Sequence, residues 1–153
     1  MNAPPSWRIR AACAEDAPDW LALRAALWPD EDADSMQADI PNMLTQPGRC
    51  AGFLAVDATR RPIGFAEATL RHDYVNGTET SPVGFFEGWY VVPEHRGRGI
   101  GRALLDAAEA WARSHGCTEF ASDALLDNRD GQRAHLACGF AETERVVYFR
   151  KPV

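Results

Sequence analysis

The chain has 153 residues and a net charge of −6, with 46% apolar and 25% charged residues. This size and composition are typical of one folded domain with a sizeable core, which we expect to span residues 1–153. The negative charge argues against nucleic acid as the main partner and mildly favours cationic ligands. No apolar run approaches the roughly 18 residues of a membrane span, so no membrane partner is expected.

The N-terminal residues 1–8 lack the apolar stretch of a secretion signal. The four cysteines are scattered and show no C-x-x-C spacing. This pattern is typical of free thiols in a reducing compartment, not of metal ligands or disulfides. We therefore expect a cytoplasmic protein that needs no metal.

The hydrophobic periodicity predicts alternating strands and helices along the whole chain. In order, they are a strand at 7–10, a helix that Asp16 can cap and Pro29 ends, a helix at 35–44, strands at 50–56, 63–71 and 83–92, a helix from about 100 that Gly116 closes, a strand at 117–122, a helix at 128–138, and one or two strands within 140–150. Pro41 falls inside the second helix and puts its integrity in doubt. This order predicts an α/β layer with a mostly antiparallel first half.

The strand at 83–92 is apolar on both faces apart from its glycines and Glu87, so we expect it to be central in the sheet. A polar excursion at 73–82 precedes it, with a tight turn at Asn76-Gly77.

A run rich in glycine and arginine joins the strand at 83–92 to the next helix, with the sequence VVPEHRGRGIGRALL from Val91 to Leu105. Glycines let backbone N–H groups approach an anion closely. The start of a helix adds unpaired N–H donors at the positive end of its dipole. The run therefore predicts a pyrophosphate site that works without a metal.

Three known phosphate-binding motifs are candidate interpretations of this glycine- and arginine-rich run. A Walker loop is excluded because it ends in Gly-Lys-Ser or Gly-Lys-Thr, and the only lysine is Lys151. A dinucleotide-binding turn with Glu119 as the ribose-binding acid stays open, although the spacing here is G-x-G-x-G. The third motif is R-x-x-G-x-G, formed by Arg96, Gly99 and Gly101. A plain strand-to-helix turn with exposed arginines is a further alternative.

The R-x-x-G-x-G motif and the order of elements resemble the GNAT superfamily of N-acetyltransferases along nearly the whole chain. Gly139-Phe140 also matches the end of the family's usual Leu-Gly-Phe, with Cys138 in place of the leucine. Four further segments are similar to the aminoglycoside 6'-N-acetyltransferases of Gram-negative bacteria, and they lie at 74–78, 86–91, 120–123 and 142–149. The resemblance implies the GNAT acyl-CoA N-acyltransferase fold, an α/β (α+β) fold whose mixed central sheet has six to seven strands, with about four helices.

The resemblance implies acetyl-CoA as cosubstrate. The central strand would hold the pantetheine arm like an added strand, and a backbone N–H there would polarise the thioester carbonyl. Gly88 would let the strand bulge to admit it, with plain strand packing as the alternative. Asn128 would touch the cofactor, although its simpler role is a helix cap. The cofactor-binding residues implied are Trp89, Tyr90, Val91, Arg96, Gly97, Arg98, Gly99, Ile100, Gly101, Arg102, Ala103 and Asn128.

Glu87 interrupts an otherwise apolar strand. A buried carboxylate without a partner is costly, and burial raises a glutamate pKa from about 4.3 toward about 6–7, which suits a base that takes a proton from an ammonium. The resemblance places the general base at Glu87. A salt-bridged structural glutamate and a residue that only positions the substrate remain alternatives.

His135 stands where many GNAT enzymes carry a tyrosine, four residues before the glycine of the final helix. That tyrosine can protonate the leaving thiolate, and a histidine that titrates near 6.5 can serve in its place. A packed helix residue, or a thiolate that leaves unaided, are the alternatives.

Substrate-binding roles also follow from the resemblance. Asp123 ends a short strand, where α/β sheets commonly hold their sites, and would anchor the substrate amine or else cap the next turn. The carboxylate of Glu144 would meet a second cation, and the aromatic rings of Trp28 and Tyr74 would meet sugar rings, although Trp28 can equally be core. One amine–carboxylate pair at about 4 Å contributes about 1 kcal/mol in water but about 4 kcal/mol at an effective dielectric near 20, so several partly buried carboxylates favour a polycation.

The sequence thus predicts an enzyme that transfers acetyl from acetyl-CoA to the 6'-amino group of aminoglycosides by direct attack in a ternary complex, giving resistance. No cysteine lies in a nucleophile motif, so no covalent enzyme intermediate is expected. The alternatives are a GNAT enzyme for a polyamine or a protein N-terminus, and a non-catalytic acyl-CoA-binding sensor. By analogy we expect a homodimer, with the final strands or the excursion around Tyr74 at the contact.

Overall fold

The computed structural model describes residues 3–153. Within this range it contains five strands and four α-helices. The strands are β1 (Trp7–Ala11), β2 (Cys50–Asp57), β3 (Pro62–Arg71), β4 (Val83–Val91) and β5 (Phe120–Ser122). The helices are α1 (Ala17–Leu27), α2 (Ala33–Leu44), α3 (Ile100–Ser114) and α4 (Arg129–Ala137).

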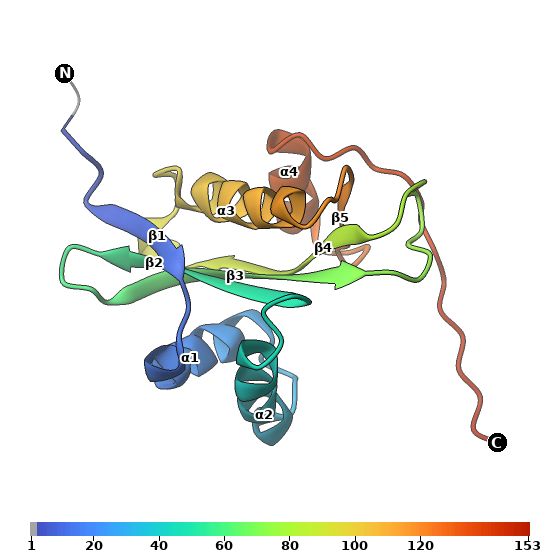
Figure 1. Cartoon of the computed structure of the whole chain (residues 1–153), viewed down its shortest axis with the longest axis horizontal. Coiled ribbons are helices and arrows are strands. Elements are labelled where there is room, and N and C mark those ends of the chain that lie inside the picture. The colour runs from blue at the N-terminus through green and yellow to red at the C-terminus, as the bar shows by residue number, and fades with distance from the viewer. Residues whose placement is uncertain (1–2) are drawn as a thin grey trace.

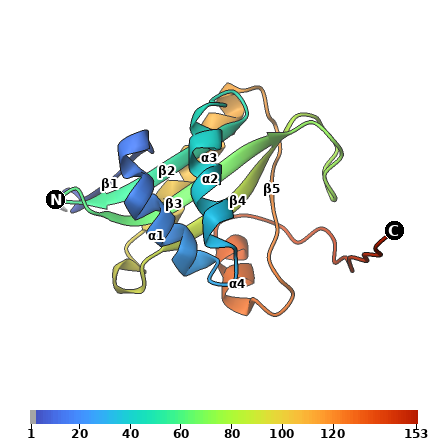
Figure 2. The same cartoon turned by 90° about the horizontal axis from the view of Figure 1, so that it is seen from below.

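The strands form one sheet in the order β1-β2-β3-β4-β5. The first four strands are antiparallel, and β5 runs parallel to β4. α3 covers one face with α4 beside it, and α1 and α2 cover the other (Figure 1). The view from below shows α1 and α2 lying across the sheet (Figure 2). β4 is therefore internal, as its apolar sequence predicts.

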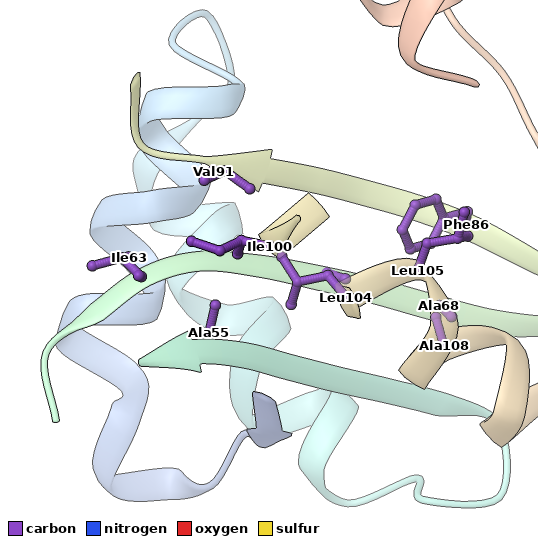
Figure 3. Close-up of a cluster of buried hydrophobic side chains, with 10 residues drawn as sticks. Ala55, Ile63, Ala68, Phe86, Val91, Ile100, Leu104, Leu105 and Ala108 are labelled. Carbon is purple, nitrogen blue, oxygen red and sulfur yellow. The ribbon is translucent and has the colours of Figure 1, made fainter. Parts of the chain in front are cut away.

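The helix α3 packs on the sheet because its apolar residues recur at helical spacing. Ile100, Leu104, Leu105 and Ala108 are almost fully buried. They face side chains of β2, β3 and β4, among which small alanines let the helix approach closely (Figure 3). Each large aliphatic side chain buried here contributes about 1.5–3 kcal/mol, so this layer holds the end of β4 and the start of α3 together.

A second cluster fills the space between the sheet and the α1–α2 pair. Trp20 and Ile40 meet Leu54 and Phe65 there. The helix α2 continues through Pro41 without a break. The predicted helices are confirmed, and their number matches the expectation.

The expected six to seven strands are wrong, because the sheet has five strands in residues 3–153. The missing strands fall in residues 140–150, which form no strand and are exposed from residue 141 onward. A strand needs a neighbouring backbone to pair with. The C-terminal segment instead passes the excursion at 73–82, where Thr143 packs on Gly77, and then leaves the sheet (Figure 1).

Every helix in the described part of the chain is too short or too polar to cross a lipid bilayer.

Candidate active site

The loop after β4 turns sharply and then starts α3. Gly97 and Gly99 have φ of 77° and 81°, a conformation that strains residues with a side chain. Arg96 Nε donates to the carbonyl oxygen of Val91 at 2.8 Å and ties the loop to the strand. Gly99 is the N-cap of α3 and offers no side chain there. The first amides of α3 are therefore available to an anion.

The cationic residues of this loop differ in their surroundings. Arg98 is exposed. Arg102 instead donates from Nη2 to the carbonyl oxygen of Ala137 at 2.9 Å, which links α3 to the end of α4. Space around Gly97 is open, since a Cβ there would meet no atom within 4 Å. Glycines at the tightest turns and an exposed helix start fit a diphosphate.

One edge of β4 loses its partner halfway along the strand. β5 pairs only with Gly84, Phe85 and Phe86. In residues 3–153, no strand pairs with that edge of β4 from Glu87 to Val91. An extended amide chain such as pantetheine can pair there as an added strand. The loop and this edge together fit coenzyme A.

Glu87 lies at a bulge between β3 and β4, where the register shifts. Its Oε1 accepts hydrogen bonds from the Thr69 hydroxyl at 2.6 Å and from Arg71 Nη2 at 2.9 Å. Its Oε2 accepts only from Arg71, at 3.1 Å. With 30% of its side chain exposed, Glu87 is neither deeply buried nor unpaired, so the ion-paired alternative describes its surroundings. Oε2 is the oxygen with room for another proton donor.

Two of the predicted substrate residues lie beside Glu87. Trp28 covers Gly88, where a Cβ would come within 2.7 Å of the indole ring. Asp123 is exposed and directly follows Ser122, whose register partner Phe86 directly precedes Glu87. The structure thus brings Trp28, Glu87 and Asp123 near the middle of β4, where β5 ends.

The other two predicted substrate residues are peripheral. Tyr74 lies on the excursion and is 76% exposed. Glu144 is exposed and follows Thr143, which packs on Gly77 of that excursion. The contact holds the two segments together but places neither residue against Glu87.

His135 lies at the point where β4 and β5 part. Its Nδ1 is 2.6 Å from the carbonyl oxygen of Gly131, so that nitrogen carries a proton. Its Nε2 is 2.8 Å from the Ser122 hydroxyl, which is also 3.2 Å from the carbonyl oxygen of Phe86. Nε2 of a neutral His135 accepts a hydrogen bond from the Ser122 hydroxyl, and Nε2 of a charged His135 donates one to that hydroxyl, which then donates to the carbonyl oxygen of Phe86. Both protonation states are satisfied, as a proton donor requires.

Asn128 and Glu119 have structural bonds. The Asn128 side chain accepts from the Gly131 amide at 3.0 Å and caps α4. Glu119 Oε1 accepts from the Thr80 hydroxyl at 2.5 Å and from the amides of Glu79 and Thr80 at 2.9 and 2.7 Å, and these bonds, the hydroxyl first, lower its pKa. Glu119 therefore anchors the excursion, and the dinucleotide alternative loses its ribose-binding acid.

A second glutamate, Glu67 on β3, was missed by the sequence analysis. It is 4% exposed, and its Oε1 accepts from Trp20 Nε1 and Arg24 Nη1, both at 2.9 Å. Burial raises its pKa to about 7, against the positive charge of Arg24. The available signal was a single charge in an apolar strand, the same argument that singled out Glu87.

Across residues 3–153, His, Cys, Asp and Glu side chains form no group fit to hold a metal ion.

This geometry, a glycine-rich helix start beside an open strand edge, fits the class of proteins that bind an acyl-CoA. The model of the acetyltransferase (GNAT) family matches residues 13–140. The chain therefore belongs to the acetyltransferase (GNAT) family.

Its relatives narrow the group. A Stenotrophomonas maltophilia protein named aminoglycoside N(6')-acetyltransferase type 1 is 54% identical over 145 residues, covering 95% of this chain and 93% of the relative. An Acinetobacter baumannii protein of the same name is 50% identical over 135 residues, covering 88% and 91%. The predicted resemblance to this subgroup is confirmed.

Solved structures agree. The Acinetobacter baumannii enzyme AAC(6')-Ih is 46% identical with a TM-score of 0.91, over 96% of this chain and 99% of that chain. The enzyme AAC(6')-Iy was solved with a bisubstrate analogue, CoA-S-monomethyl-acetylneamine; it is 42% identical with a TM-score of 0.90, over 96% and 99% of the two chains.

Proposed function

We propose that this chain transfers the acetyl group of acetyl-CoA to the 6'-amino group of aminoglycosides, by direct attack in a ternary complex. The observation that carries the proposal is the open edge of β4 beside the carboxylates of Glu87 and Asp123. The chain is also 54% identical to an enzyme named for this reaction. Acetylation removes one positive charge from the antibiotic, which weakens its hold on ribosomal RNA and gives resistance.

The proposed roles divide along β4. Acetyl-CoA, when bound, supplies an acetyl group as a thioester. The loop Arg96–Ala103 binds its diphosphate, and the backbone of Trp89, Tyr90 and Val91 holds its pantetheine arm. A backbone N–H on this edge donates to the thioester oxygen, an effect worth about 2.7–4 kcal/mol where such a donor has been removed in other enzymes.

Glu87 and His135 handle the protons in this proposal. Oε2 of Glu87 takes a proton from the substrate ammonium, directly or through a water, which frees the amine lone pair. The nitrogen then forms its bond to the thioester carbon as the carbon–sulfur bond breaks, and it loses a second proton to water, which leaves a neutral amide. His135 gives a proton to the departing sulfur and is reprotonated from solvent.

The acceptor is held by charge and by an aromatic wall. Asp123 anchors an ammonium, Trp28 and Tyr74 meet the sugar rings, and Glu144 meets a further cation. Several negatively charged carboxylates around one site favour a ligand with several ammonium groups over a monoamine.

We further propose that the chain acts as one domain in the cytoplasm and as a homodimer. The four cysteines are free thiols, as in a reducing compartment. The segment after Thr143 carries Val147, Tyr148 and Phe149, and Phe149 is 92% exposed. A run of exposed apolar side chains favours burial against a second copy of the chain. Light scattering tests this: Val147→Asp with Phe149→Asp should be monomeric, whereas the control Leu126→Asp, at a residue that is 69% exposed and outside this segment, should stay dimeric.

The reaction is tested by the release of free thiol from acetyl-CoA. Kanamycin should give turnover that spermidine and an N-terminal peptide do not match, and the product should carry the acetyl group on the 6'-nitrogen by nuclear magnetic resonance. Turnover only with spermidine or the peptide would reassign the acceptor. Coenzyme A binding by calorimetry without turnover on any amine would make the protein a sensor.

A further inference from the structure

A row of three residues crosses the sheet under α1, with Gly52, Glu67 and Gly88 in register. Only the middle residue has a side chain. A Cβ on Gly52 would come within 2.6 Å of the Trp20 ring, and a Cβ on Gly88 within 2.7 Å of the Trp28 ring. Each indole thus occupies the space over a glycine, and the carboxylate of Glu67 emerges between them.

Trp20, Arg24 and Trp28 are four residues apart along α1 and its C-cap, so they share the face that covers this row. Trp20 and Arg24 both donate to Glu67. The other arm of Arg24, Nη2, donates to Asp39 of α2 at 2.9 Å. The guanidinium carbon of Arg24 lies 5.1 Å from the centre of the Trp28 ring. Both terminal nitrogens of Arg24 are therefore fixed by carboxylates, and its guanidinium packs against the ring of Trp28.

The buried Glu67–Arg24 pair is not explained by stability alone. Glu67 and Arg24 are both buried, and among the described residues Arg24 Nε finds no hydrogen-bond partner. Apolar side chains of similar volume are often at least as stable as a buried ion pair. Hydrogen bonds to two carboxylates fix the plane of the Arg24 guanidinium, because these bonds are directional. An apolar side chain makes no directional bonds and would not be fixed in this way.

We propose that Glu67 is a positioning residue for the acceptor: it fixes Arg24, and Arg24 fixes Trp28 over Gly88. This places the indole as a rigid wall next to Glu87, the residue that receives the substrate proton. The inference rests on the proposed function, because it needs the acceptor to bind beside Glu87. It assigns a role to a residue that touches neither substrate nor coenzyme A.

The test is steady-state kinetics with kanamycin and acetyl-CoA. Glu67→Gln keeps the shape of the side chain but removes its charge. It should raise the KM for kanamycin about tenfold, because the wall is no longer fixed in place, with kcat changed less than about threefold. The KM for acetyl-CoA should not change. Arg24→Lys keeps the cation but loses the planar fork, and should give the same split if Glu67→Gln does not fold.

Coupling to the indole is tested by a double variant. If Glu67 acts through Trp28, then Glu67→Gln combined with Trp28→Ala should have the same KM for kanamycin as Trp28→Ala alone. A double variant whose KM is the product of the two single effects would overturn the proposal.

The matched control is Asp16→Asn, which breaks another Arg–carboxylate pair at the far end of α1, with Arg10. It should lower the melting temperature and leave the KM for kanamycin unchanged. A Glu67→Gln enzyme that behaves like this control would show a purely structural role and overturn the inference. If instead the unaltered enzyme releases no thiol with kanamycin, it is the proposed function that fails.

Discussion

Glu67 and Glu87 lie on neighbouring strands and each binds an arginine, but water reaches them differently. The side chains of the Glu67–Arg24 pair are 5% and 7% exposed, and those of the Glu87–Arg71 pair are 30% and 43% exposed. The first pair is buried under α1, and the second is open to solvent beside the part of β4 where the acceptor is proposed to bind. In our proposals the Glu67–Arg24 pair positions Trp28 and Glu87 exchanges a proton, because solvent access decides which carboxylate can meet a substrate.

The largest effect should come from the open pair. Glu87→Gln should lower kcat for kanamycin about 100-fold or more, because general base catalysis contributes about 10²–10⁴-fold. Coenzyme A affinity, measured by calorimetry, should be retained. Glu79→Gln, an exposed glutamate on the excursion, is the control and should leave kcat unchanged. Full turnover in the Glu87→Gln enzyme would remove the base role.

The buried pair should show itself in the pH dependence of stability. The pKa of Glu67 is raised from 4.5 to about 7, so the folded state binds the proton more tightly than the unfolded state. Its contribution is therefore fully present below pH 4.5 and is lost as the pH rises toward 7, by an amount on the order of 2–3 kcal/mol. Urea unfolding from pH 4.5 to 7.5 should show this decline in the unaltered protein but not in Glu67→Gln. Equal slopes in the two proteins would contradict the shift.

A third pair should behave in the opposite way. Both nitrogens at the end of Arg10 donate to Asp16 at 2.7 Å, and Asp16 also accepts from the Cys13 amide. The Arg10 bonds lower the pKa of Asp16 well below its usual value. This contribution is present above about pH 4 and is lost as the pH falls.

Asp16→Asn should accordingly lower the free energy of unfolding by about 2 kcal/mol at pH 7, the size of a charge-assisted hydrogen bond, and by less at pH 3. Unfolding by urea at the two pH values measures the difference. A loss that stays the same at pH 3 would mean that the charge of Asp16 is not what stabilises this corner.

The smallest effects are expected from alanine substitutions at Gly52 and Gly88, the two ends of the row under α1. Gly52→Ala displaces Trp20 and Gly88→Ala displaces Trp28, and such overpacking typically costs about 1–3 kcal/mol. Thermal unfolding should register both changes at the low end of that range. Only Gly88→Ala should also raise the KM for kanamycin. An equal effect on KM from Gly52→Ala would erase the distinction between the core tryptophan and the wall tryptophan.

Local patterns in the sequence predicted most of the fold. Helical spacing in α3, the apolar run of β4 and the Asn128 cap of α4 all appear as expected, because each depends on residues close together in the chain. The prediction of strands within residues 140–150 was wrong, because a strand forms only where a backbone from elsewhere in the chain lies beside it. The segment around Phe149 has strand-like residues but no strand beside it.

The candidate site divides in the same way. The loop Arg96–Ala103 could be located from spacing alone, since its glycines and its helix start are local features. The partners of Glu87, which are Thr69 and Arg71, could not, because a register shift between β3 and β4 brings them together. The same holds for Ser122 against His135, which meet only where β5 ends beside α4.

The sequence by itself determined the family and located the glycine-rich loop that we propose binds coenzyme A, together with the residues that carry acid, base or aromatic side chains. Only the tertiary structure decided how those residues are ionised and oriented, since burial and pairing belong to the assembled sheet and helices. It made Glu67 and not Glu87 the buried glutamate, because Trp20 and Arg24 of α1 bind Glu67, whereas Glu87 pairs with the more exposed Arg71.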